Sequence, residues 1–307
     1  MMGCVVGSRP VLLSGRNGLG DAIYTRAIAR AVARDHDTYV ATAWPELFLD
    51  LPVRMVRPQS TLYGPTANVA RYPKQFWTRP PPTARLYRLR YAWNKLPHVG
   101  ILAQMEALAR TKLEPFAFDL PKWGHLVALT RPPMAGQRIA VVRPVTDRRD
   151  WSNPARNPDP AYVVRAAELL IDAGFRVVSI ADLVSGVEDP LGELPPAHER
   201  FDHGELGVRE ILSLVQDAAI VVGGPGWIVP ACLASGTPLV VIGGGQNGCN
   251  GSQALLDPRM DATRVGWLMP DFYCPCTSKR HGCNKEISGF DTRFQAAIGA
   301  IALGRAA

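Results

Sequence analysis

A glycine-rich turn near the start of the chain carries the first residues that could do chemistry. It reads Ser14-Gly15-Arg16-Asn17-Gly18-Leu19-Gly20-Asp21 and joins a short apolar run to a helical pattern. Such a turn lets a ligand approach backbone N–H groups at the positive end of a helix, and we assign Gly18 and Gly20 to ligand binding. The same helix dipole stabilises the Asp21 carboxylate, unless that residue simply caps the helix. The spacing is neither the dinucleotide fingerprint nor a Walker loop.

A second turn of this kind occurs late in the chain, between a strand pattern and a helical one. It comprises Gly223, Gly224, Pro225, Gly226 and Trp227. Its backbone donors could hold a diphosphate, so we assign these five residues to a binding site for one. The alternative is a tight connection selected for steric reasons alone.

Arginines follow the first strand pattern of the second half of the chain. Arg143, Arg148 and Arg149 lie in the segment RPVTDRRDW. Guanidinium groups suit a diphosphate or a sugar phosphate, so we predict that these three bind phosphate. The alternative is a solvated charged loop.

Residues 51–105 form a basic stretch without any Asp or Glu. They include nine Lys or Arg and seven aromatic residues. Cations interleaved with aromatic rings suit a polyanion through phosphate contacts and stacking. We assign Arg85, Arg88 and Arg90 to binding it; the alternative is a basic solvated face whose aromatic residues belong to the core.

Three cysteines and a histidine lie within ten residues near the C-terminus, as Cys274-Pro-Cys276-x4-His281-x-Cys283. Three thiolates and an imidazole suit a structural tetrahedral Zn²⁺ that would staple a loop and take no part in chemistry. Cys249 could replace one ligand. The alternative is a set of free thiols. The chain start shows no secretory signal, so we expect a cytoplasmic protein with reduced thiols.

The elements that must position these residues alternate between strand and helix. Strand patterns occur at 11–14, 38–43, 53–58, 138–144, 175–183, 218–224 and 238–244, and helical patterns at 21–34, 45–51, 100–112, 159–173, 208–216, 227–234 and 291–303. Residues 130–137 are typical of a linker. The order predicts an α/β fold of two facing Rossmann-like domains with a cleft between them.

We expect an N-terminal domain over 1–133, a second domain over 138–290, and a C-terminal helix within 291–307 that packs back on the first domain. The composition, 307 residues with 47% hydrophobic and 20% charged, excludes a disordered chain, a coiled coil or a small disulfide scaffold. The net charge of +7 favours an anionic partner. Residues 218–250 are uncharged, but glycine turns interrupt them, so we predict no transmembrane segment.

Taken in order, GLGDAIYTRAIARAV, RRDW and GELGVREILSLVQDAAIVVGGPGWIVPACLASGTPLVVIGG resemble the heptosyltransferase-like glycosyltransferases, family 9 of the GT-B fold. The resemblance covers most of the chain and is weakest over residues 58–130. It implies that Asp21 is the general base, that Arg149, two residues before Trp151, touches the donor phosphates, and that 224–226 contact the donor diphosphate and sugar.

The late turn departs from the family pattern. The family usually has an Asp and a hydroxyl residue in this turn and a His in the following helix, where this chain has Gly224, Pro225 and Val229. An ADP-heptose donor would therefore lose its usual carboxylate contact, which leaves the donor sugar open.

The implied function is transfer of a sugar from a nucleotide-sugar donor to a hydroxyl of an anionic acceptor. Asp21 would take the acceptor proton, while the arginines and the late turn would stabilise the leaving diphosphate. No DxD motif is evident, so we expect no catalytic cofactor and metal-independent transfer. In this fold the N-terminal half holds the acceptor, which places Gly18, Gly20, Arg85, Arg88 and Arg90 on the acceptor side.

Two acceptors fit the basic stretch: a lipopolysaccharide core, or a hydroxymethylated DNA base flipped out of the duplex, which would make this a DNA-modification enzyme. Two other functions remain open. A nucleotide-sugar epimerase shares this fold, and a non-catalytic sugar- or nucleic-acid-binding module is compatible with the altered late turn.

Overall fold

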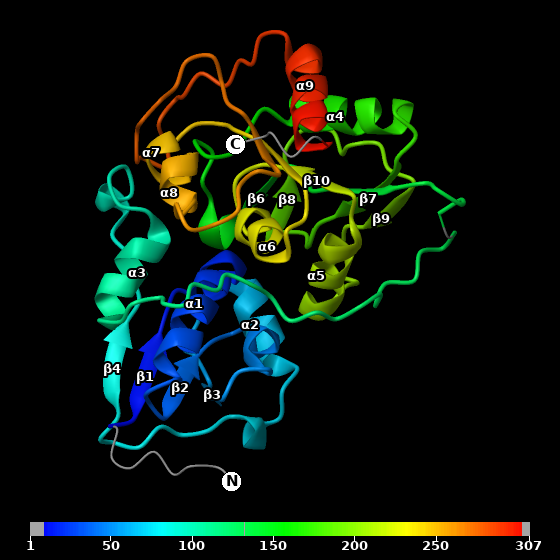
Figure 1. Ribbon diagram of the computed structural model, residues 1–307. Helices are drawn as coiled ribbons and strands as arrows, with labels where there is room; N and C mark the ends of the chain where they lie inside the picture. The colour runs from blue at the N-terminus through cyan, green and yellow to red at the C-terminus, as the bar shows by residue number, and fades with distance from the viewer. Residues whose placement is uncertain (1–8, 132, 303–307) are drawn as a thin grey trace.

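The computed structural model describes residues 9–131 and 133–302 and consists of two α/β halves, each built on a parallel sheet (Figure 1). The first sheet has the order β3-β2-β1-β4. Its strands are β1 (Val11–Ser14), β2 (Thr38–Ala41), β3 (Val53–Val56) and β4 (Arg85–Arg88). The helices of this half are α1 (Leu19–Val32), α2 (Tyr63–Ala70) and α3 (Ile101–Ala109), with short 3₁₀ turns at η1 (Pro45–Phe48), η2 (Lys74–Phe76) and η3 (Trp93–Lys95).

The second sheet has six parallel strands in the order β12-β11-β10-β5-β7-β9. They are β5 (Ile139–Val142), β7 (Arg176–Ile180), β9 (Glu199–Phe201), β10 (Ile220–Gly223), β11 (Leu239–Ile242) and β12 (Val265–Leu268). The helices are α4 (Pro160–Asp172), α5 (Val208–Asp217), α6 (Ile228–Ser235), α7 (Asn247–Asn250), α8 (Ser252–Leu255) and α9 (Phe290–Ala302). A short hairpin of β6 (Thr146–Arg148) and β8 (Glu188–Pro190), with η4 (Arg149–Trp151), lies beside this sheet.

In both halves the strand order reverses beside the first strand, at β1/β4 and at β5/β10. Ligands of open α/β sheets bind at such switch points, outside the carboxyl ends of the strands. The four central strands β5, β7, β10 and β11 are largely apolar and buried along almost their whole length, because helices cover both faces of the sheet. The topology confirms the predicted α/β fold of two Rossmann-like halves.

The two halves meet where α1 and α6 begin (Figure 1). A Cβ on Gly20 would lie 3.2 Å from Trp227 Cα and 3.4 Å from Pro230 Cγ, so glycine permits this close approach. A second contact joins the halves at Tyr24, whose hydroxyl donates a 2.6 Å hydrogen bond to the Leu255 carbonyl. The helix starts that follow β1 and β10 therefore face one common space.

The irregular segment between residues 58 and 120 contains two elements that the sequence did not predict. Helix α2 carries Gly64 and Pro65, and β4 reads Arg-Leu-Tyr-Arg, so neither has an apolar period. Strand β4 forms because it pairs in parallel with β1 over its whole length. The pairing partner, which is distant in sequence, determines this strand.

The C-terminal helix differs from the expectation that it packs on the first domain. In the part of the chain that the structure describes, α9 packs on β12, β11 and α4 of the second half. Phe294 is fully buried there, with its ring 5.7 Å from that of Phe290. The chain also crosses between the halves earlier than expected, since Pro121, Leu126 and Thr130 already hydrogen-bond to the second half. No helix of the described residues is long and apolar enough to span a membrane.

We expect Phe294→Ala to lower the free energy of unfolding by about 3–5 kcal/mol, because it leaves a cavity between α9 and the second sheet. Chemical denaturation of both proteins would measure this difference. Gln295→Ala, an exposed substitution on the same helix, should change stability by less than about 0.5 kcal/mol. Equal effects of the two variants would contradict the packing of α9 on the second half.

Candidate active site

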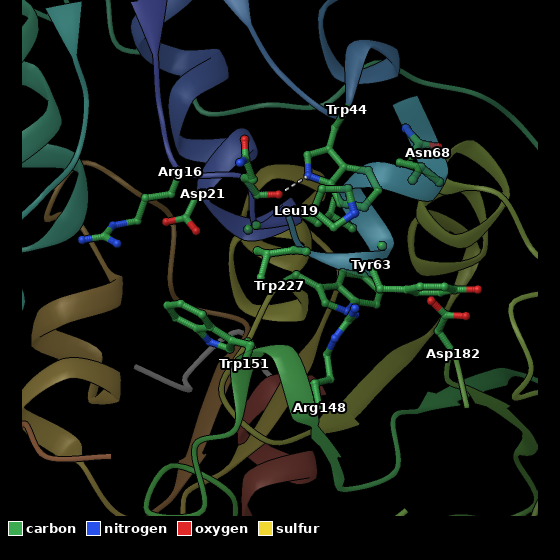
Figure 2. Close-up of a pocket in the computed structure, with 18 of the residues that line it drawn as sticks. Arg16, Leu19, Asp21, Trp44, Tyr63, Asn68, Arg148, Trp151, Asp182 and Trp227 are labelled. Atoms are coloured by element: carbon green, nitrogen blue, oxygen red, sulfur yellow. Dashed lines mark hydrogen bonds between the residues drawn. The ribbon is translucent and has the colours of Figure 1, made fainter. Parts of the chain in front are cut away.

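A cleft of about 600 Å³ lies between the carboxyl-terminal edges of the two sheets. The first half contributes the turn after β1 and parts of α2, and the second half contributes the ends of β7 and β9 and the turn before α6. Figure 2 shows Asp21 and Arg16 from the first half, Trp151 and Arg148 from the second, and Trp227 between them. The cleft therefore joins segments from both halves that the sequence had marked separately.

Asp21 lies in the first turn of α1 and lines the cleft. The Tyr91 hydroxyl donates a 2.7 Å hydrogen bond to its Oδ1 atom. Oδ2 lies over Gly18, where a Cβ would approach it to 2.6 Å, and among the described residues it has no hydrogen-bond donor. Burial raises the pKa of the Asp21 carboxyl, while the Tyr91 hydrogen bond and the charge of Arg16 oppose that rise. One oxygen is thus held in place and the other is available to a ligand.

Cations and aromatic rings line the wall beside Asp21. The Arg16 guanidinium lies 4.7 Å from the ring centroid of Tyr91 and donates a 2.8 Å hydrogen bond to the Tyr91 carbonyl. The Trp93 ring lies 6.1 Å from that of Trp151, which comes from the second half. The Lys279 ammonium packs on Trp151, 3.6 Å from its ring centroid, although Lys279 itself is not a lining residue. Such a wall suits a planar or sugar ring that carries negative charge.

Three arginines of the second half, Arg143, Arg148 and Arg156, line the cleft, and two of them contact one buried carboxylate. Glu188 is 2% exposed and accepts contacts from Arg143 at 3.4 Å and Arg148 at 3.3 Å. Burial lowers the pKa of Arg143, and it lowers the pKa of Arg156 to about 10. The buried Arg156 Nε has no partner among the described residues. Asp150 also lines the cleft and pairs with Arg148 at 3.4 Å. Guanidinium groups of this kind could bind phosphate oxygens.

Another carboxylate, Asp182, follows β7 and lines the cleft beyond this cation group. Its pKa is raised by burial and by the nearby charge of Glu188, against the opposing charges of Arg148 and Arg71. Rossmann-like folds place a ribose-binding acid at the end of this strand position. Asp182 therefore lies where a nucleoside could be recognised.

The predicted phosphate ligands divide between the cleft and its surroundings. Arg143 and Arg148 line the cleft, whereas Arg149 is 70% exposed, pairs with Asp189 and is not a lining residue. Arg148 is the last residue of β6 and pairs with Glu188 of β8, whereas Arg149 begins the 3₁₀ turn η4 and its side chain lies outside the cleft. Arg156, which the sequence analysis did not identify, lines the cleft, and Arg149 does not.

The late turn divides in the same way. Pro225, Gly226 and Trp227 line the cleft, and a Cβ on Gly226 would meet open space. Gly223 and Gly224 do not line it: a Cβ on Gly224 would lie 2.9 Å from Pro158, and one on Gly223 would lie 2.9 Å from Ile228. For these two glycines, steric packing is the reason for the residue type.

The residues assigned to the acceptor are also split. Gly18, Gly20 and Arg90 line the cleft. Arg85 and Arg88 lie on the exposed edge strand β4, and Arg85 pairs with Val11 at the end of the sheet remote from the cleft. Of the nine Lys and Arg residues in the basic stretch, Arg71 and Arg90 line the cleft.

The sequence analysis missed Arg16, Tyr91, Arg156 and Asp182 as site residues. Arg16 lies within the first glycine-rich turn, so its position was available as a signal. Asp182 lies near the end of the strand predicted over 175–183, where ligands of α/β sheets bind. Tyr91 and Arg156 reach the cleft only through the folding of irregular segments, and nothing in their local spacing indicates it.

The cysteine cluster comes together as predicted. The ligand atoms of Cys274, Cys276, His281 and Cys283 all lie within 4.8 Å of one another. The two closest thiols, of Cys276 and Cys283, are 3.5 Å apart, and His281 Nδ1 is 3.2 Å from Cys283 Sγ. These residues could hold a metal ion. Cys249 lies apart, in α7, where its thiol faces the Trp93 carbonyl at 3.7 Å.

Solved structures share this fold at low sequence identity. TibC from enterotoxigenic E. coli H10407, described as an iron-containing dodecameric glycosyltransferase, is 16% identical, with 97% of this chain and 76% of TibC covered and a TM-score of 0.60. TibC is also described in complex with ADP-D-beta-D-heptose. E. coli ADP-heptose lipopolysaccharide heptosyltransferase II is 13% identical, with 96% and 98% covered and a TM-score of 0.57.

A family 9 glycosyl transferase from Veillonella parvula DSM 2008 is 9% identical, with 96% of this chain and 98% of that one covered and a TM-score of 0.58. No family model matches the chain, and no curated protein matches it in sequence. The chain therefore has the two-sheet α/β fold of GT-B glycosyltransferases and matches family 9 heptosyltransferases in structure, as its sequence predicted.

Proposed function

We propose that this protein is a glycosyltransferase that moves a sugar from a nucleotide-sugar to a hydroxyl of an anionic acceptor. The observation that carries the proposal is that two different functional groups line the same cleft. Asp21 offers a carboxylate oxygen without a hydrogen-bond donor among the described residues, and three arginines of the second half, Arg143, Arg148 and Arg156, line the opposite side of the cleft. A base for the acceptor hydroxyl and cationic hydrogen-bond donors for the leaving diphosphate are what sugar transfer requires.

In this mechanism the acceptor hydroxyl gives its proton to Asp21 Oδ2 as its oxygen bonds to the sugar C1. The bond between C1 and the diphosphate oxygen breaks, and the nucleoside diphosphate leaves with the bonding electron pair. The three arginines stabilise the charge on that leaving group. The hydrogen bond from the Tyr91 hydroxyl to Oδ1 keeps the Asp21 carboxylate in position. None of these steps needs a metal ion.

The donor would lie along the second half. Trp151 and Trp227 offer flat surfaces to the sugar or base, and Asp182 is placed to accept hydrogen bonds from the ribose hydroxyls. The TibC complex with ADP-D-beta-D-heptose supports a nucleotide-sugar donor for this fold. The late turn offers no carboxylate here, since Gly224 packs on Pro158 and Val229 is fully buried. We therefore leave the transferred sugar open among hexose, heptose and pentose.

The acceptor would enter beside Asp21, between Arg16 and Arg90, and is anionic on this account. A lipopolysaccharide core and DNA with a hydroxymethylated base both offer a hydroxyl beside phosphates. Supplying each with the same nucleotide-sugars and following radiolabel into the acceptor separates them. Donor turnover without acceptor would indicate the epimerase alternative, and sugar binding without turnover would indicate a binding module.

The decisive test of Asp21 is Asp21→Asn. We expect the transfer rate to fall at least about 100-fold while the dissociation constant of the donor changes by less than about twofold, because the base is removed and the donor side is untouched. Steady-state transfer and calorimetric titration of the donor measure the two quantities. A variant that keeps the wild-type rate would exclude Asp21 as the base.

The buried Asp21 carboxyl should make the stability of the folded protein depend on pH. Burial raises its pKa, so the folded protein holds this proton to a higher pH than the unfolded chain does. Between the ordinary and the raised pKa the folded state binds more protons, so this residue lowers stability as pH rises. We expect Asp21→Asn to gain melting temperature relative to the wild type through that window, and to keep the gain at neutral pH.

Thermal unfolding from about pH 4 to about pH 8 measures this difference. Asp35→Asn, at an exposed position just beyond α1, serves as control and should run parallel to the wild type. If the melting temperatures of Asp21→Asn and the wild type differ by the same amount at every pH, Asp21 is not desolvated.

Arg156 and Arg149 provide a matched pair for the donor site. We expect Arg156→Gln to weaken binding of ADP, UDP or GDP, whichever binds best, by about 10- to 100-fold, because a buried cationic donor to phosphate is lost. Arg149→Gln should leave binding unchanged, because Arg149 points away from the cleft. The reverse result would restore the role that family resemblance gives Arg149. Calorimetric titration measures both variants.

We also propose that Cys274, Cys276, His281 and Cys283 hold a structural metal ion, with Zn²⁺ the first candidate from the donor set. The related fold of TibC is described as iron-containing, which makes iron the second candidate.

A further inference from the structure

The cysteine cluster belongs to a long segment without regular structure. Between the end of β12 and the start of α9, residues 269–289 form no helix or strand. The spacing of its thiols and imidazole, 3.2 to 3.5 Å between neighbouring ligand atoms, is close to the edge of a tetrahedron with metal bonds of about 2.0–2.3 Å. The donor set therefore fits a thiophilic metal ion. Such an ion would act as a cross-link that fixes the loop.

This loop is bonded to the segment that carries two cleft residues, Trp151 and Arg156. The Lys279 carbonyl accepts a 3.0 Å hydrogen bond from the Ala155 N–H, and the Lys279 ammonium lies over the Trp151 ring. Lys285 Nζ donates a 2.9 Å hydrogen bond to the Pro154 carbonyl. One of these residues lies between the ligands Cys276 and His281 and the other lies two residues after Cys283, so the cluster is directly joined to residues 151–155.

The same loop holds a second wall of the cleft. The N–H groups of Asn247 and Gly248, in α7, donate to the carbonyls of Cys274 and Cys276 at 3.0 and 3.2 Å. A Cβ on Gly245 would lie 2.3 Å from Cys283 Sγ, so the chain before α7 is in direct contact with the cluster. Asn250, at the end of α7, lines the cleft. Two ligand residues thus hydrogen-bond directly to a cleft wall.

The two walls are also joined to each other. Gly245 N–H donates a 2.7 Å hydrogen bond to the Ala155 carbonyl, and Asn153 Nδ2 donates a 2.8 Å bond to Gln246 Oε1. Segment 151–157 contains no α-helix or strand, so its position depends on these contacts. Strand β6 also holds the segment, through hydrogen bonds from Ser152 to Asp147 and from Asn157 to the Thr146 carbonyl. Between these two anchors, residues 153–155 bond to the loop and to the chain before α7, so the loop fixes the part of the segment that precedes Arg156.

We propose that a thiophilic metal ion at Cys274, Cys276, His281 and Cys283 holds the wall that carries Trp151 and Arg156 in its binding position, so that metal occupancy sets the affinity of the cleft for a nucleoside diphosphate. The identity of the ligand rests on the proposed function. The mechanical coupling between cluster and wall rests on the contacts alone. The metal takes no part in the transfer step.

The test uses the purified full chain. Metal content is measured by mass spectrometry, the ion is removed with a chelator under reducing conditions, and Zn²⁺ or Fe²⁺ is returned separately. Amide hydrogen exchange is followed in residues 149–158 and 244–251, with the α1 segment as internal reference. We expect stripping to speed exchange in both segments at least about tenfold, to leave α1 unchanged, and to weaken binding of ADP, UDP or GDP at least about tenfold. Returning the ion that the site prefers should reverse both effects.

Two substitutions give a matched control. His281→Ala removes one ligand and should reproduce the stripped state, whereas His281→Cys keeps four donors and should retain metal, slow exchange and nucleotide binding. If His281→Ala fails to fold, chelation of the wild type still decides the question.

The proposal is overturned if the protein holds neither Zn²⁺ nor Fe²⁺. It is overturned equally if stripping leaves exchange at 149–158 unchanged, or speeds exchange without weakening a nucleotide that the metal-bound protein binds. A metal-bound protein that binds no nucleoside diphosphate would refute the donor assignment and the affinity part of the proposal, while exchange would still decide the coupling.

Discussion

The contact between the first turns of α1 and α6 is the constraint on which the site depends. Both helices start directly after central strands, β1 and β10, and Gly20 lets them approach until a Cβ would touch Trp227. This contact brings the positive ends of two helix dipoles to one space. Asp21 and the late turn are neighbours for that reason, although more than 200 residues separate them in sequence. The cleft, its charge and its aromatic walls are arranged around this meeting point.

Charge is unevenly distributed within the cleft. Arg143 and Arg148 both contact Glu188. Arg156 forms no ion pair with a carboxylate of the described residues, and burial lowers its pKa to about 10. A buried cation without a full counter-charge costs folding free energy, and proteins keep such groups mainly where a ligand supplies the missing charge. Arg156 lies in an irregular segment, so this free-energy cost does not arise within the central strands. The strands themselves remain apolar and well packed.

Local sequence patterns predict those structural features that are formed by residues close together in the chain. The turn Ser14–Asp21, the late turn and the cysteine cluster each lie within ten residues. The structure brings the four residues of the cluster together, and both turns reach the cleft, although Gly223 and Gly224 do not line it. Local patterns do not predict features that depend on contacts between residues far apart in the sequence. Strand β4 exists because β1 is beside it, and Arg148 rather than Arg149 faces the cleft because β6 pairs with β8 in one register. Tyr91 and Arg156 lie in loops whose course only the complete fold determines.

The position of α9 on the second half has a consequence for how the molecule could be divided. Within the described residues, the chain passes from the first half to the second once, near Pro121, and does not return. The half that carries the arginines and the cysteine cluster is therefore a continuous length of chain. A chimaera with another protein of this fold needs a single junction there, and it would exchange the whole of one cleft wall while leaving Asp21 and Tyr91 in place.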